Sequence, residues 1–204
     1  MNPSEIENGK FDSEEIGPWS RWHNDLDAKI LVIGQDWGDK CFFIDNQGRD
    51  IDNNPTNKNL TTLFEEIEYD LGTARPVSPF QKGLFFSNSI LGIKTSESGM
   101  SAAVREKWVK HSTDQYTLPL IDIIKPEVII TLGTKAYRAM RFIFSELKDG
   151  KMKDLVEECF VVGERKTLLF PRYHCGGLGL ANRSFDNQKS DWQRIKVQLS
   201  TLAK

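Results

Sequence analysis

A short apolar run that ends at a glycine and continues into a carboxylate-bearing loop constrains this chain most. It reads Ile30-Leu31-Val32-Ile33-Gly34-Gln35-Asp36, and its continuous apolar part is typical of a strand buried on both faces of a parallel sheet. Ligands of open α/β sheets bind outside the carboxyl ends of the strands. Asp36 is therefore expected at a binding edge, as a general base or as a partner for developing positive charge. The alternative is that Asp36 only caps its loop or the helix after it.

Length and composition predict one domain that spans residues 1–204. A chain of 204 residues with 39% hydrophobic and 27% charged residues is typical of a soluble globular protein. No apolar run approaches the roughly 20 residues that cross a bilayer, and residues 1–10 do not resemble a secretory signal. We therefore expect a cytoplasmic protein. Residues 1–27 are expected to be an irregular lead-in, with Trp19 and Trp22 packed against the body.

The chain alternates strand and helix patterns. Strands are expected at 30–33, at 83–87 ending in Asn88, at 128–132, and at 167–170 with a break at Pro171. Helical spacing is expected from an entry at Asn54-Pro55 to Gly72, at 102–111, at 115–124, from Thr134 to Leu147, and in a last helix with Trp192, Ile195 and Leu199. This alternation predicts right-handed crossovers and an α/β fold, a three-layer αβα sandwich with a central, mostly parallel four-stranded sheet.

Asp36, Asn88 and His174 each follow or end a predicted strand, so we expect them at the same rim of the sheet. Hydrolysis of the N-glycosidic bond to a pyrimidine would use all three. A carboxylate can stabilise the cationic sugar and direct water, and an imidazole N–H can stabilise the departing oxyanion. An Asn amide carries a donor and an acceptor side by side, which matches the O4 and N3–H edge of uracil.

Several segments resemble the uracil-DNA glycosylase superfamily, in the order in which the family has them. Gly34-Gln35-Asp36 is similar to the start of the family's Gly-Gln-Asp-Pro-Tyr-His motif. Residues 84–89 are similar to the strand that ends in its uracil-reading Asn, here Asn88. Residues 125–133 resemble its Pro-x-Val-Ile-x-x-Leu-Gly segment, and His174 resembles the His of its His-Pro-Ser loop.

The resemblance implies a monofunctional DNA glycosylase of base-excision repair, which flips uracil or a related deaminated base out of the duplex. Asp36 and His174 would then be catalytic, and the base-binding residues would be Gln35, Phe43 and Asn88. Leu178 would be the apolar wedge, and Gly176 and Gly177 would let the backbone approach a phosphate. The resemblance also implies a monomer that acts on DNA with a damaged base, near the nucleoid, without a cofactor, a metal, a membrane or an obligate protein partner.

The charge and the cysteines refine this expectation. A net charge of −2 excludes a broad basic coat, although a local patch can follow a phosphate backbone. Arg183 is the predicted DNA contact within such a patch, which would also hold Arg172, Lys189 and Arg194; a solvated face explains these side chains equally. Three scattered cysteines predict neither a disulfide framework nor a metal site, and the iron–sulfur branches of the superfamily use four. Cys175 beside His174 is not expected to be a nucleophile, since sequence neighbours seldom point at one atom.

Trp37-Gly38-Asp39 stands where the family has Pro-Tyr-His, which leaves open which base is removed. Two other functions remain open as well. The chain could be a catalytically silent nucleic-acid-binding member of the fold, or it could hydrolyse free nucleosides or nucleotides.

Overall fold

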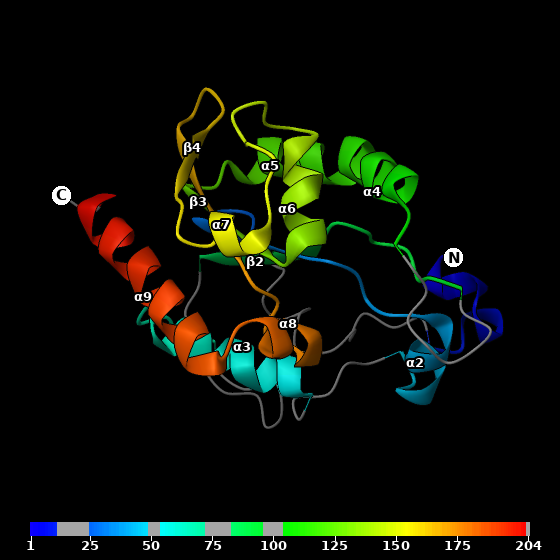
Figure 1. Ribbon diagram of the computed structural model, residues 1–204. Helices are drawn as coiled ribbons and strands as arrows, with labels where there is room; N and C mark the ends of the chain where they lie inside the picture. Colours follow the sequence, from blue (N-terminus) through cyan, green and yellow to red (C-terminus); the bar gives the residue numbers. More distant parts are fainter. Residues whose placement is uncertain (12–24, 49–53, 72–82, 96–103, 203–204) are drawn as a thin grey trace.

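A computed structural model describes residues 1–11, 25–48, 54–71, 83–95 and 104–202, and its centre is a five-stranded sheet (Figure 1). The strands are β1 (Ile30–Gly34), β2 (Leu84–Asn88), β3 (Val128–Leu132), β4 (Phe160–Val162) and β5 (Thr167–Arg172). They lie in the order β2-β1-β3-β5-β4, and only β4 runs antiparallel to its neighbour. The predicted α/β class with a mostly parallel sheet is confirmed.

The predicted number of four strands is wrong, because β4 adds a fifth strand at the edge of the sheet. β4 has three residues, which is too short for an alternation pattern to identify it in the sequence. It pairs with the start of β5, from Val162 opposite Thr167 to Phe160 opposite Leu169. β4 therefore forms where the chain before β5 pairs with it in the antiparallel direction.

The predicted break of β5 at Pro171 is also wrong, since the strand continues to Arg172. The Leu168 amide donates to the Glu127 carbonyl and the Gly133 amide donates to the Arg172 carbonyl. The backbone N–H and C=O groups of the even-numbered residues of β5 therefore point toward β3. Pro171 therefore turns its nitrogen away from β3. Because β4 pairs no further than Leu169, no ladder bond is lost there, which is the situation in which strands tolerate proline.

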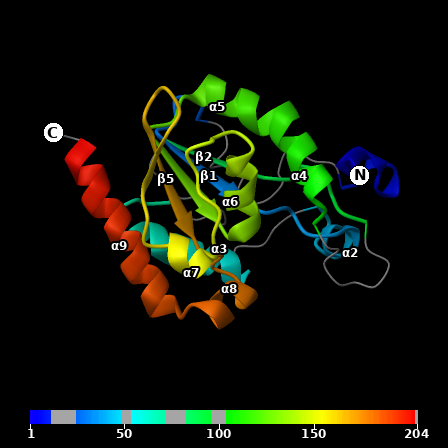
Figure 2. The ribbon, with the colours of Figure 1, turned by 45° about the horizontal axis from the view of Figure 1, so that its top comes forward.

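Helices cover both faces of the sheet (Figure 2). Their bounds are α2 (Lys40–Asp45), α3 (Pro55–Glu65), α4 (Glu106–Ser112), α5 (Leu118–Ile124), α6 (Thr134–Arg141), α7 (Met152–Leu155), α8 (Gly177–Asn182) and α9 (Phe185–Leu202), with short turns η1 (Pro3–Glu5) and η2 (Glu7–Gly9). Ile30 and Val32 pack with α3 and α9. Leu31 and Ile33 pack with α5 and α6 on the other face.

Helix α3 begins where the sequence predicted, and α5 ends where it was predicted to end. Asn54 caps α3, its Oδ1 accepting from the Thr56 amide at 2.9 Å, with Pro55 in the first turn as predicted. The two helices expected at 102–111 and 115–124 are instead joined by a π-helical turn, η3 (Thr113–Thr117). Pro119 follows this turn and has no N–H for an α-helical bond, which explains the local widening. The short helices α2, α7 and α8 were not predicted.

The predictions for Trp19 and Trp22 lie outside the described residues. Within the ranges given above, no helix combines the length and apolar character needed to cross a bilayer.

Trp192 on α9 is fully buried, and its ring lies 4.9 Å from that of Phe64 on α3. We expect Trp192→Ala to lower the free energy of unfolding by about 3–5 kcal/mol, because it leaves a cavity between helix and sheet. Val197→Ala on the exposed side of α9 is the control, with an expected change within about 0.5 kcal/mol. Chemical denaturation measures both, and equal effects would contradict the packing described.

Candidate active site

A pocket of about 450 Å³ opens at the carboxyl ends of the parallel strands. Asp36, Asn88 and His174 all line it, as the sequence predicted. Further lining residues not predicted for this role are Trp37, Phe42, Asn54, Thr56, Asn57, Phe86 and Leu132. β2 and β3 lie on opposite sides of β1, so the pocket lies at the switch in strand order where α/β sheets bind ligands.

The Asp36 side chain is 5% exposed and is held by three donors. Its Oδ1 accepts from the Gly38 amide at 2.8 Å and lies 3.1 Å from Lys94 Nζ, and its Oδ2 accepts from Gln35 Nε2 at 2.8 Å. Asp36 thus stabilises its own turn, as the alternative interpretation expected, while also lining the pocket. The helix that follows is capped by Asp39 instead.

Asn88 is brought to the pocket by the register of β2 on β1, in which it lies opposite Gly34. A Cβ on Gly34 would overlap Asn88 Oδ1, so only glycine lets the amide lie across the end of β1. The Asn88 side-chain amide has no hydrogen-bond partner among the described residues. Its donor and acceptor are therefore available to a ligand.

His174 presents a defined proton to the pocket. The Gly176 amide donates to His174 Nδ1 at 2.9 Å, which assigns the proton of the neutral ring to Nε2. Burial lowers the pKa of His174, and the nearby Asp36 carboxylate opposes this shift. The neutral imidazole is therefore favoured at neutral pH, with Nε2–H as a hydrogen-bond donor.

The loop after His174 is fixed against α3. Asn59 Nδ2 donates to the Cys175 carbonyl at 2.7 Å, and a Cβ on Gly176 would press on Thr56 Oγ1 and the His174 ring. Cys175 is fully buried, and burial raises the pKa of its thiol to about 12. Burial thus disfavours the thiolate form of Cys175, in line with the expectation that it is not a nucleophile.

Leu178 is 87% exposed beside the pocket, in the first turn of α8. A Cβ on the neighbouring Gly177 would meet no atom within 4 Å, so open space lies around this residue. Leu178 thus places a large apolar side chain at the edge of the pocket, and its role as a wedge stays a prediction.

Phe43 does not line the pocket, so its predicted base-stacking role is corrected by the structure. Phe43 is buried with Ile6 and Ile93, whereas Phe42 is 39% exposed and lines the pocket. The Asp39 cap starts α2 so that Phe42 packs next to Gly38 and Phe43 turns inward. A one-residue shift on a helix moves a side chain to another face.

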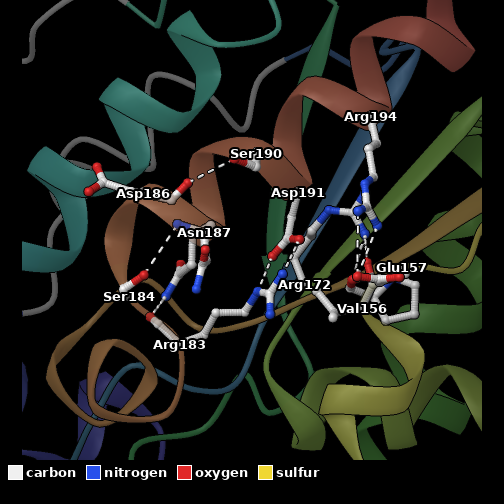
Figure 3. A network of polar contacts seen from close by, with 12 residues as sticks. Val156, Glu157, Arg172, Arg183, Ser184, Asp186, Asn187, Ser190, Asp191 and Arg194 are labelled. Atoms are coloured by element: carbon white, nitrogen blue, oxygen red, sulfur yellow. Dashed lines mark hydrogen bonds and ion pairs between the residues drawn. The ribbon is translucent and has the colours of Figure 1, made fainter.

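Arg183 forms an ion pair with Asp191 of the same chain, and its role as a DNA contact stays a prediction (Figure 3). Its Nε and Nη2 donate to the Asp191 carboxylate at 2.6 and 2.7 Å, and the Asp191 side chain is 2% exposed. Arg172 lies nearby, fully buried, and donates to the carbonyls of Val156 and Pro171. Burial lowers the pKa of Arg172 to about 10.

These two arginines precede and follow the segment that carries His174 and Leu178, and Asp191 of α9 acts on both through a direct pair or a Coulombic attraction. The segment is therefore anchored at its two ends. Lys189 and Arg194, the other members of the predicted basic patch, also lie near carboxylates, those of Glu66 and Glu157. Within the described ranges, no group of three His, Cys, Asp or Glu side chains is placed to hold a metal ion.

Asp191→Asn should lower the free energy of unfolding by about 3–5 kcal/mol, because it leaves two arginine charges without their buried counter-charge. Asp186→Asn is the matched control, since Asp186 is exposed on the same helix. Urea unfolding of both variants measures the difference. A loss no larger than that of the control would contradict the anchoring role of Asp191.

The stability of the protein should depend on pH through His174. The lowered pKa in the folded state means that the unfolded chain binds more protons below about pH 6.5, so stability increases with pH in that window. We expect His174→Gln to reduce this increase, measured as the difference in unfolding free energy between about pH 5 and about pH 7.5. His111→Gln, at an exposed position, is the control and should retain the wild-type increase.

No family model matches the chain, and no curated protein matches it.

Proposed function

We propose that this protein is a DNA glycosylase that hydrolyses the N-glycosidic bond of uracil or a related deaminated base in DNA, as a step of base-excision repair. The observation that carries the proposal is the convergence of Asp36, Asn88 and His174 on one pocket, from three different strand ends. Their chemistry is complementary, since they are a carboxylate, an amide with a free donor and acceptor, and a neutral imidazole with an N–H donor. The pocket volume is within the range of small-molecule sites.

In this proposal each group acts at a different part of the flipped nucleotide. The Asp36 carboxylate stabilises the cationic sugar and positions the attacking water. The Asn88 amide binds the O4 and N3–H edge of the base. His174 Nε2–H donates to the base oxygen on which negative charge develops as the glycosidic bond breaks, and a neutral donor is suited to this task because it keeps its proton.

Base flipping is supported by the surroundings of the pocket. The exposed Leu178 would fill the gap that the nucleotide leaves in the duplex. Phe42, rather than Phe43, would stack on the base, together with or in place of Trp37. Because Trp37-Gly38-Asp39 follows Asp36, the proposal names the class of deaminated bases to which uracil belongs, and not one base.

We further propose that the fold is the three-layer αβα sandwich predicted from the sequence, supported by the hydrophobic cluster on each face of the sheet. The protein would act as a cytoplasmic, nucleoid-associated monomer, with DNA as its partner and without a cofactor.

One observation favours a second candidate, the hydrolysis of a free nucleoside or nucleotide. Arg183, Lys189 and Arg194 all lie near carboxylates of the same chain, which reduces the positive charge they offer to a DNA backbone. A small substrate with the same base would use the same pocket chemistry and would need no basic channel.

The test is incubation with labelled oligonucleotides that carry uracil, hypoxanthine, xanthine or a thymine mismatch, followed by alkaline cleavage at abasic sites. We expect cleavage by the wild type, and a loss of about 100-fold or more in Asp36→Asn and His174→Gln, because the first variant removes the charge that stabilises the sugar and the second removes the positioned imidazole donor. Asp45→Asn, an exposed carboxylate on α2, is the control.

Cleavage of every oligonucleotide by Asp36→Asn at the wild-type rate would refute the proposed mechanism. Turnover of free nucleosides without cleavage of any oligonucleotide would favour the second candidate. DNA binding that is unchanged in Asp36→Asn, without an abasic product, would indicate a silent binding protein.

A further inference from the structure

We infer that Lys94 is a positioning residue of this site, which holds Asp36 in one orientation and balances its charge so that His174 keeps its neutral, donating form. The inference rests on the proposed function and extends it to a residue for which neither the sequence pattern nor the resemblance assigned a role.

Lys94 and Asp36 form a buried ion pair at the end of β1. The distance from Lys94 Nζ to Asp36 Oδ1 is 3.1 Å, and the two side chains are 1% and 5% exposed. A lysine is rarely buried to this degree unless it is paired. Because the pair is largely shielded from water, solvent screens the attraction between the two charges only weakly.

The backbone also fixes Lys94 beside the Asp36 loop. The Lys40 amide donates to the Lys94 carbonyl at 2.8 Å, and Asp39 and Lys94 form a parallel β-bridge. The preceding Ile93 packs into the small cluster that contains Phe43. The chain that leaves β2 after Asn88 thus returns along the loop after β1, and one segment delivers both Asn88 and Lys94.

The donors around Asp36 leave one acceptor position open. A carboxylate offers about four acceptor positions, two on each oxygen. Lys94 and Gly38 occupy those of Oδ1, and Gln35 occupies one of Oδ2. One position on Oδ2 therefore remains for the attacking water or the sugar. Without Lys94, the Gly38 amide would remain on Oδ1 and the Gln35 side-chain amide on Oδ2, so the carboxylate would be held less firmly.

The same pair determines the charge that His174 experiences. Asp36 lies near His174 and favours its protonated form, which would carry an unwanted positive charge beside the cationic sugar. Among the described residues, the charged group that shifts the pKa of His174 is Asp36. The titratable groups next to Asp36 in that set are Lys94, as its ion-pair partner, and His174. The ammonium of Lys94 offsets the influence of the carboxylate and so helps to keep the imidazole neutral.

The experiment compares Lys94→Met, Lys94→Gln and Lys94→Arg with Lys29→Met as the matched control. Lys29 pairs with Glu127 at 3.3 Å, but both side chains are exposed. Lys29 comes just before β1, whereas the pocket lies at the other, carboxyl end of this strand. Circular dichroism first identifies the folded variants, and Lys94→Gln replaces Lys94→Met where the methionine variant does not fold.

Two readouts are measured on each folded variant. Single-turnover cleavage of a uracil oligonucleotide should slow by about 10- to 100-fold in Lys94→Met or Lys94→Gln, with substrate affinity changed only a few-fold, because the loss is one of orientation. Lys94→Arg should restore most of the rate. NMR titration should show a higher pKa of His174 in the neutral variants than in the wild type or Lys94→Arg, with the signal assigned by its absence in His174→Gln.

Either a wild-type cleavage rate or an unchanged His174 titration in a folded neutral variant overturns the inference. If the wild type cleaves no oligonucleotide, the proposed function fails, and the titration alone then decides whether Lys94 balances Asp36. The two failures are therefore distinguishable.

Discussion

The pairing of β1 with both β2 and β3 determines where the polar groups of this protein lie. Because β1 is parallel to both neighbours, the chain leaves all three strands at the same edge. Gly34 lies opposite Asn88 in this register, and its missing side chain creates the space for the Asn88 amide. A shift by one residue would turn Asn88 to the other face of the sheet and would close the pocket. The hydrophobic clusters on both faces of the sheet hold that register.

Electrostatics in the pocket are set by burial more than by the number of charges. Asp36, Lys94 and His174 form a chain of neighbouring groups in a place that excludes most water. In such surroundings an unpaired carboxylate or ammonium would be costly. The pairing of Asp36 with Lys94 makes a buried carboxylate tolerable and leaves the imidazole neutral by desolvation. Among the described residues, the site therefore combines a carboxylate paired with an ammonium and a neutral imidazole donor.

The segment that carries His174 and Leu178 has to be rigid at its ends while exposing its tip. Two contacts from α3 hold the loop near Cys175, and the arginines at its ends are balanced by Asp191 on α9. Between these anchors, Gly177 and Leu178 are exposed. The arginine that the sequence suggested for DNA is thus part of the internal framework. A buried carboxylate offers a pairing partner that a sequence pattern does not show.

The sequence by itself determined the α/β class, the four longer strands and the meeting of Asp36, Asn88 and His174 at one edge, because buried parallel strands have continuous apolar runs and their carboxyl ends align. Tertiary structure alone decided what depends on contacts between distant segments. It added β4, which forms by folding back on β5, and it turned Phe42 rather than Phe43 to the pocket through the Asp39 cap. It also paired Arg183 with Asp191 and brought Lys94 to Asp36. Neither pair leaves a local pattern in the sequence, since which charges are buried against one another depends on how distant segments pack.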